Sequence, residues 1–392
     1  VTEAITDETY PYLQLQTKDI DIPLDNGFYR LKIGGLDLRK SGLRLDHVHL
    51  VSPYSKMEFA YKQPKHQDWF DVKVGNVRLN DVDIPGYFST KELRVGGLWI
   101  NDVLLQNLKN RKIPVEPHIV PMIYEGLQKA PVRFKIDTAS VANFSVVYEE
   151  LPVKGDKLGK LGKLYFTDMN GQFSGLTNIV SYPEQFITLH ADGNLMGSGH
   201  FTATWQLPVD SLYDRFLLDA RLDSLDLLSL NEIIKPLAPA EVTSGWAQDV
   251  VFHMDASSRK GRIRLDFPYR KLKVALLKEK DGETTQKGFL SRLANLVLRD
   301  NNPAHPERKD SKLRKVDMEI VRDPYHSTFN YLWQMLRPAL VESVGVSKKE
   351  QDAALKVAGF FTKVKRFFGL DKKKDKREEI DTNNKEIEPL KE

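Results

Sequence analysis

Two histidines are the first side chains whose spacing could do chemistry. His47 and His49 stand two residues apart, so both would lie on one face of a strand and could act as a pair of metal ligands. No third ligand follows nearby in the sequence, and two surface histidines are the simpler interpretation. The sequence therefore predicts no metal site.

A group of acidic residues is the second candidate. Glycoside hydrolysis needs two carboxyl groups about 5 to 10 Å apart, and the sequence offers Asp219, Asp223, Asp226 and Glu232. Acidic side chains facing solvent on strands and turns explain this group more simply. The stretch GNLMGSGH at 193–200 lacks the spacing of a phosphate-binding loop, and neither GxSxG nor HExxH occurs. We expect no catalytic residues, no cofactor and a protein that is not an enzyme.

The composition is that of a folded protein and excludes several classes. Of its 392 residues, 41% are hydrophobic and 29% charged, which argues against global disorder. The absence of cysteine excludes disulfides, cysteine-ligated zinc and a thiol nucleophile. The net charge of +4 is small, and no basic stripe is interleaved with aromatics, so we expect no nucleic-acid partner.

Membrane crossing by a helix is also not predicted. A spanning helix needs about eighteen consecutive apolar residues, and no such run occurs. The chain starts at Val1 without a signal-like region, so a membrane anchor, if the protein has one, is expected to be absent from this chain.

One apolar ladder recurs in the first hundred residues. The segments LKIGGLDL (31–38), VKVGNVRL (72–79) and LRVGGLWI (93–100) alternate apolar and polar residues, as a strand with one buried face does. Each has glycine at the same point, where we expect a bulge, a bend or a hairpin turn. If these strands line a groove, the residues facing it are Ile33, Leu36, Val72, Val74, Val77, Leu79, Val95, Leu98 and Ile100.

Alternation continues through most of the chain, at 132–151, 164–179, 186–207, 216–227 and 261–279. Helical spacing predicts a short helix at 227–239, a helix at 326–345 kinked at Pro338, and an amphipathic helix at 351–370. About twenty short strands would make a sheet too wide to stay flat. The predicted fold is mainly β: an elongated, curled antiparallel sheet forming a repeating β-groove, with a short internal helix and C-terminal helices.

Three regions follow from this pattern. Residues 1–325 form the groove body, 326–370 a helical segment that is partly amphipathic, and 371–392 a charged tail expected to be disordered.

The segment from Phe216 to Glu279 resembles the C-terminal part of the AsmA-like family of bacterial envelope proteins. A strand with a Leu-Asp rhythm leads to a short helix and PLAP, then to a Ser-Gly turn and the strand pair of GRIRLDFPYRKLKV. With the strands before it, the resemblance covers 132–337. It implies a bridge-like, groove-forming β protein of the periplasm, anchored at the inner membrane, reaching toward the outer membrane and linked to outer-membrane lipid homeostasis.

The helix predicted at 351–370 has an apolar face beside basic residues. Such a helix can lie in a membrane interface, with aromatics in the acyl boundary and cations at anionic headgroups. The same face could instead cap the end of the sheet. The candidate membrane contacts are Phe360, Phe361, Lys363, Val364, Arg366, Phe367 and Phe368.

Together these patterns predict a non-enzymatic envelope protein that shields or conducts lipid acyl chains between membranes. The expected partners are a phospholipid or other acyl lipid, a membrane surface and further envelope proteins. The alternative is a membrane-associated scaffold for outer-membrane assembly, in which side chains or helices fill the groove.

Overall fold

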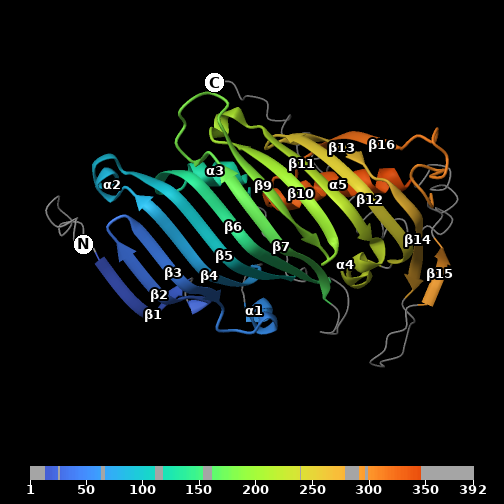
Figure 1. Ribbon diagram of the computed structural model, residues 1–392. Helices are drawn as coiled ribbons and strands as arrows, with labels where there is room; N and C mark the ends of the chain where they lie inside the picture. Colours follow the sequence, from blue (N-terminus) through green and yellow to red (C-terminus); the bar gives the residue numbers. More distant parts are fainter. Residues whose placement is uncertain are drawn as a thin grey trace, which may run out of the picture. The chain divides into compact units, whose positions relative to one another are not determined.

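The computed structural model describes residues 14–24, 27–62, 67–110, 118–152, 161–238, 240–278, 291–295 and 299–345. The chain divides into two units, Val1–Val346 and Ser347–Glu392, and every described residue belongs to the first. The predicted mainly β fold is confirmed, because the described strands join in one large, mostly antiparallel sheet (Figure 1).

The sheet has sixteen strands within the described residues. They are β1 (Gln14–Leu24), β2 (Tyr29–Arg39), β3 (Gly42–Val51), β4 (Trp69–Val82), β5 (Glu92–Asn110), β6 (Arg133–Leu151), β7 (Gly162–Ser174), β8 (Leu176–Thr177), β9 (Phe186–Leu195), β10 (Gly199–Pro208), β11 (Phe216–Asp226), β12 (Ala240–Ala256), β13 (Lys260–Asp266), β14 (Tyr269–Lys278), β15 (Ser291–Asn295) and β16 (Lys315–Val321). The helices are α1 (Lys56–Lys62), α2 (Ile84–Thr90), α3 (Ile123–Gln128), α4 (Asn231–Leu237) and α5 (Thr328–Val344).

Two features of the predicted sheet are wrong. The sheet is open and not strongly curled, and helices pack on one of its faces. It is also not wholly antiparallel: β5 pairs with β6 in parallel, since the segment containing α3 carries the chain back to the other end of the sheet. The remaining neighbours along the path β1-β2-β3-β4-β5-β6-β7-β9-β10-β11-β12-β13-β16 are antiparallel.

One face of this sheet is apolar from end to end. Register partners in neighbouring strands point to the same face, and one row of partners has an apolar residue in every strand of the path. The row runs Leu15, Leu38, Leu43, Leu79, Leu98, Ala139, Phe173, Leu189, Trp205, Leu218, Met254, Ile263 and Met318. We call this the leucine row.

The opposite face is polar. The partners one residue away from the leucine row are Gln16, Asp37, Arg44, Arg78, Trp99, Ser140, Gln172, His190, Thr204, Asp219, His253, Arg264 and Asp317, of which Trp99 alone is apolar. Many of these side chains pair across strands, as His253 does with Asp219 at 2.7 Å. Hydrogen bonds from Arg39 and Arg262 lower the pKa values of Asp37 and Asp317.

The apolar face is packed over the second half of the sheet. α5 crosses it there, with α3 on the same side (Figure 1). Tyr331, Met335 and Ala339 of α5 are fully buried in one core with Met254 and Ile263. The predicted helix at 326–345 is therefore confirmed. It continues through Pro338 and ends at Gly345, whose positive φ of 67° closes the C-terminus.

The glycines of the repeated ladder lie in the middle of long strands, so they do not mark hairpin turns. Gly34, Gly75 and Gly96 each face a residue of a neighbouring strand that has left-handed backbone conformation, which tilts that residue's Cβ toward the glycine. A Cβ added at Gly34 would lie 3.1 Å from the Cβ of His47 (φ 53°), and one at Gly75 would lie 2.9 Å from that of Asp102 (φ 58°). Glycine is required here by a close approach between strands.

These left-handed residues also keep the apolar face continuous. The apolar alternation shifts by one residue at the same place in successive strands, for example between Leu45 and Val48 of β3, on either side of His47, and between Ile100 and Val103 of β5, on either side of Asp102. A shift of one residue would turn every later side chain to the other face. The left-handed residue turns the backbone and so compensates for that shift. The apolar residues before it and after it therefore point to the same face.

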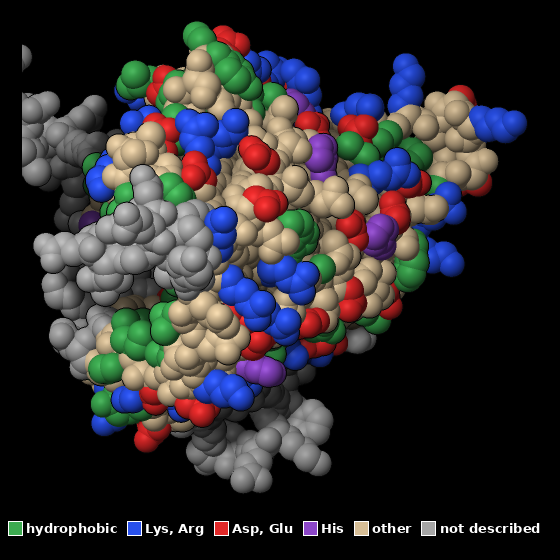
Figure 2. Space-filling view, turned by 60° about the vertical axis from the view of Figure 1, so that its left-hand side comes forward, with side chains coloured by type: hydrophobic (Ala, Val, Ile, Leu, Met, Phe, Trp, Pro, Cys, Tyr) green, Lys and Arg blue, Asp and Glu red, His purple; other side chains and the backbone are tan. Residues whose placement is uncertain are grey.

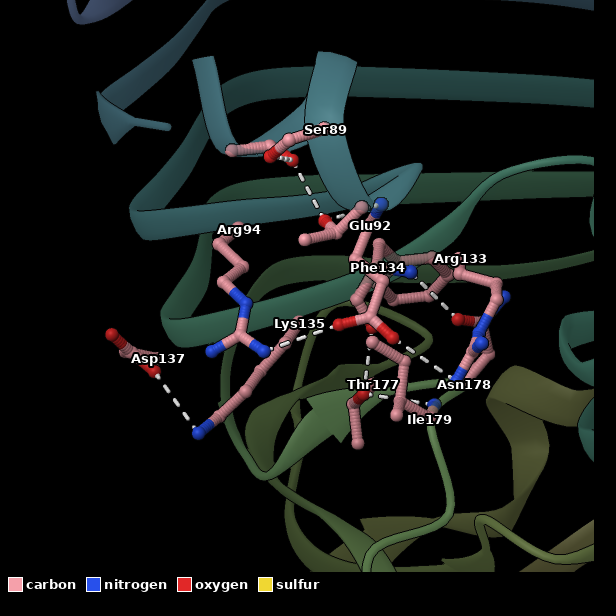
Figure 3. Close-up of polar contacts among 12 residues, drawn as sticks. Ser89, Glu92, Arg94, Arg133, Phe134, Lys135, Asp137, Thr177, Asn178 and Ile179 are labelled. Atoms are coloured by element: carbon pink, nitrogen blue, oxygen red, sulfur yellow. Dashed lines mark hydrogen bonds and ion pairs between the residues drawn. The ribbon is translucent and has the colours of Figure 1, made fainter. Parts of the chain in front are cut away.

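A polar cluster fixes the start of the parallel strand pair (Figure 3). The carboxylate of Glu92 on β5 lies 3.1 Å from both Arg94 and Arg133 of β6. Asn178 accepts a hydrogen bond from the Phe134 N–H at 2.7 Å and donates to two backbone carbonyl oxygens. The cluster holds β6 beside β5 where no tight turn does so.

The close approach at Gly75 predicts a sensitive position. We expect Gly75→Ala to lower the free energy of unfolding by about 1–3 kcal/mol, because its Cβ would collide with that of Asp102. The matched control is Gly126→Ala in α3, where an added Cβ meets nothing within 4 Å and helix propensity favours alanine.

Denaturant unfolding measures both effects, and Asp102→Gly should remove most of the cost of Gly75→Ala by removing the opposing Cβ. Equal losses for Gly75→Ala and Gly126→Ala would refute the close-approach explanation.

Candidate functional site

The candidate site is the apolar side of strands β1–β5, which we call the uncovered face. Besides the leucine row, three rows of register partners cross these strands. They are Thr17, Leu36, Leu45, Val77 and Ile100; Ile20, Ile33, Val48, Val74 and Val103; and Ile22, Leu31, Leu50, Val72 and Leu105. All but Thr17 are apolar, so the face presents aliphatic side chains over the width of five strands.

Three of the four rows meet one another on a regular strand. The leucine row reaches β9 at Leu189, and the rows of Val77 and Val72 reach it at Ala191 and Leu195. These residues are separated by even numbers in a strand without left-handed residues, so they point to one face. Leu189 and Leu195 both pack against the buried core under α5. The uncovered face is therefore the continuation of the core-forming face.

The nine predicted groove residues lie on this side of the sheet with different exposure. Ile33 and Val95 are buried, at 9% and 2% exposed, whereas the other seven are half-buried. Eight of the nine belong to the four rows. Val95 lies beyond a second left-handed residue, Asp81, which faces Gly96. Sequence alternation thus identified apolar-face positions, but it did not distinguish the buried ones from those that remain accessible.

Helices close the ends of the uncovered face and leave its centre open. α1 and α2 lie at opposite ends of the strands (Figure 1). The buried Phe59 of α1 packs on Tyr29, with ring centroids 5.4 Å apart. Farther along, the Phe329 ring at the start of α5 lies 5.8 Å from that of Trp205 in the leucine row. Among the described residues, no helix covers the middle of β1–β5.

The helices α1, α2 and α3 were missed by sequence reasoning. Each has six or seven residues, which is too short for a helical period to emerge from the sequence. Local signals were present at α2, where Asp83 accepts a hydrogen bond from the Gly86 N–H and Pro85 occupies the first turn. The predicted helix at 227–239 is confirmed as a 3-10 turn (Leu227–Leu230) followed by α4.

The two histidines of the first candidate site line a shallow furrow on the polar face. His47 is a left-handed residue, and His49 lies 3.0 Å from the carboxylate of Asp71. Charges of both signs share the furrow, including Asp19, Lys32 and Lys73. The described residues contain no group of three or more histidine and carboxylate side chains placed to hold a metal ion.

The acidic candidates have other partners. Asp219 pairs with His253, and Asp223 lies 3.4 Å from Arg221. Asp226 accepts a hydrogen bond from the Leu228 N–H at 3.0 Å and so caps the 3-10 turn. These contacts give Asp219, Asp223 and Asp226 structural roles, and Glu232 lies in the first turn of α4.

Charged side chains of both signs are intermixed over the surface that Figure 2 shows, which is the side on which β1 lies. On β1 and β2, Arg30 donates a hydrogen bond to Asp21 at 2.8 Å and lowers the pKa of that carboxyl. The predicted membrane contacts from Phe360 to Phe368 lie outside the described residues. None of the described helices is long and apolar enough to cross a bilayer.

Fold and site together define a β protein built on one wide, open sheet with an apolar face that helices cover only in part. A comparison with models of known protein families finds no match for the chain, and a comparison with curated proteins finds none either.

The uncovered face predicts binding of apolar molecules. We expect an environment-sensitive apolar dye to bind the protein, and Val77→Lys to weaken that binding about tenfold, because the dye would lose apolar contact worth ~1–2 kcal/mol. Arg78→Glu is the matched control, since Arg78 is the adjacent, exposed residue on the polar face. Dye titrations of the three proteins measure the effect, and a stronger loss with Arg78→Glu would contradict the assignment of the faces.

Proposed function

We propose that this chain is an AsmA-like envelope protein that holds lipid acyl chains on the uncovered face of β1–β5. One observation carries the proposal. Apolar rows continue from the packed core into a region where most of their residues are only half-buried and where no described helix lies over the middle of the strands. An apolar surface of this extent is a marker of binding.

The dimensions of the face suit an acyl chain. Neighbouring strands lie ~4.8 Å apart, so five strands present a row about 20 Å long. The hydrocarbon core of a bilayer is about 30 Å thick for two leaflets. One row can therefore accompany an acyl chain over its whole length.

The energetics favour such a surface over water. Each CH₂ moved out of water gains about 0.8 kcal/mol, so a chain of sixteen carbons is disfavoured in water by ~12 kcal/mol. A continuous aliphatic face offers surroundings close in free energy to those of the membrane. It lowers the barrier to transfer without giving the movement a direction.

The covered half of the sheet limits how far an acyl chain can extend along the apolar rows. Under α5 the leucine row enters closely packed surroundings, where Met254 of the row and Met335 of α5 are both nearly inaccessible. We infer that a lipid chain occupies β1–β5 and is stopped where α3 and α5 begin. This arrangement agrees with shielding or conducting lipid in the periplasm, with the inner membrane, the outer membrane and other envelope proteins as partners.

The alternative is an assembly scaffold whose apolar face takes no lipid. The two are separated by a phospholipid with a photoactivatable acyl chain, cross-linked to the protein from vesicles. We expect adducts in peptides from β2–β5, fewer adducts in Val77→Lys and unchanged adducts in Arg78→Glu.

A variant lacking 347–392 serves as the control for the candidate amphipathic helix. Adducts retained in β2–β5 without that segment support the uncovered face as the lipid site. Two results would leave the scaffold as the better proposal. One is adducts confined to the C-terminal segment, and the other is no adducts above the level of an added control protein that does not bind lipid.

A further inference from the structure

The outer edge of β1 is a long sheet edge with which no other described strand pairs. Within the described residues β1 pairs with β2 alone, and nine of its eleven residues are exposed. Leu15 and Ile22 are 52% and 42% exposed. Proteins usually shorten, charge or cover such an edge to prevent pairing with other chains. Here it is long, and its apolar residues continue the rows of the uncovered face.

The left-handed residues of neighbouring strands indicate which residue an added strand would need opposite Asp19. In antiparallel succession β1, β3 and β5 run in the same direction. The Cβ of His47 in β3 points toward Gly34 in β2, and the Cβ of Asp102 in β5 points toward Gly75 in β4. We say that such a left-handed residue leans toward the neighbouring strand that its Cβ approaches. In β4, which runs the opposite way, Asp81 leans on Gly96 of the following strand. The direction of lean thus follows strand direction, as chirality requires.

Asp19 of β1 is a left-handed residue of the same kind, with φ 53°. By the direction of its strand, it leans away from β2 toward the free edge. The contacts of Gly34 agree, since the three atoms nearest a Cβ added there belong to Asp46 and His47 and none to Asp19. Asp19 therefore lacks the glycine that His47 and Asp102 each have.

We propose that the outer edge of β1 binds an extended segment of another polypeptide, with a glycine facing Asp19 and aliphatic residues completing the apolar rows. The pairing of β4 with β5, in which Gly75 faces the left-handed Asp102, supplies the register. With Gly75 of such a segment opposite Asp19, Val74 would pair with Ile20 and Leu79 with Leu15, as they pair with Val103 and Leu98. Lys73 would then face Asp21.

Two other occupants fit less well. Residues 1–13 contain no glycine. A second copy of the chain joined through β1 would place Asp19 opposite a strand that has no glycine either. Pro23 has no N–H to donate, so the added strand is expected to pair only as far as Ile22. This proposal does not depend on lipid binding.

The test traps the added strand by a disulfide, which is free of background because the chain has no cysteine. The protein carries Leu15→Cys, and the probe is a synthetic peptide with the sequence of residues 71–82 and cysteine in place of Leu79. At equilibrium in a glutathione buffer, we expect more mixed disulfide than with a scrambled peptide. A peptide with valine in place of Gly75 should be trapped about tenfold less, because its side chain collides with Asp19.

Variants of Asp19 distinguish the contact between Asp19 and the peptide glycine from non-specific binding of the peptide. Asp19→Gly removes the leaning Cβ while permitting the same backbone, so the preference for the glycine peptide should fall to less than about threefold. Asp19→Asn is the matched control: it keeps the Cβ and tolerates the left-handed conformation, so the preference should remain. Denaturant midpoints establish that the variants are folded.

The proposal is overturned if the glycine and valine peptides are trapped equally, if neither exceeds the scrambled peptide, or if Asp19→Gly leaves the preference unchanged. A disulfide-linked dimer of Leu15→Cys that excludes the peptide would show that a second copy is the occupant. None of these outcomes bears on photo-cross-linking of lipid, so the two proposals fail separately.

Discussion

The apolar face depends on a handed contact between neighbouring strands, in which a left-handed residue leans its Cβ into a space that only glycine leaves free. His47 with Gly34 and Asp102 with Gly75 repeat this contact. A Cβ added at either glycine would lie only 3.1 Å or 2.9 Å from the opposing Cβ. Left-handed backbone is costly for most residues and least so for Asp and Asn. Aspartate occupies several of these positions, including Asp19, Asp81 and Asp102, which keeps the cost low.

This contact changes what a long strand can do. Strands of up to nineteen residues must bury the same face throughout, although their sequences change phase within them. Because the change of phase and the irregular backbone occur at the same place in neighbouring strands, four rows of apolar residues remain parallel across the sheet. A regular strand with the same sequence would turn half of its apolar residues into solvent. The glycine contact is therefore the condition for a wide amphipathic sheet.

Sequence alternation was enough to predict the mainly β fold, the strands and the side of the sheet on which residues such as Leu36, Val77 and Leu98 lie. It failed where the cause is not local. The glycines were interpreted as bulges, bends or turns, because their partners, His47 and Asp102, lie in other strands. That error divided long strands into short ones and raised the expected number of strands to about twenty. The parallel pair of β5 and β6 was missed for a similar reason, since the cluster around Glu92 and Asn178 joins segments far apart in sequence.

The division of one face into a covered and an uncovered half also bears on how the sheet is stabilised. Beneath α5 the rows gain full burial, so that half supplies the core on which the fold depends. Over β1–β5 the same residues gain only part of that stabilisation, and β1 gains the least, as its exposed leucine and isoleucine show. An acyl chain on the face and a strand at the edge would each bury surface that the isolated chain leaves in water. Because each would enlarge the apolar surroundings of the other, occupancy of the edge should favour occupancy of the face by mass action, although neither requires the other.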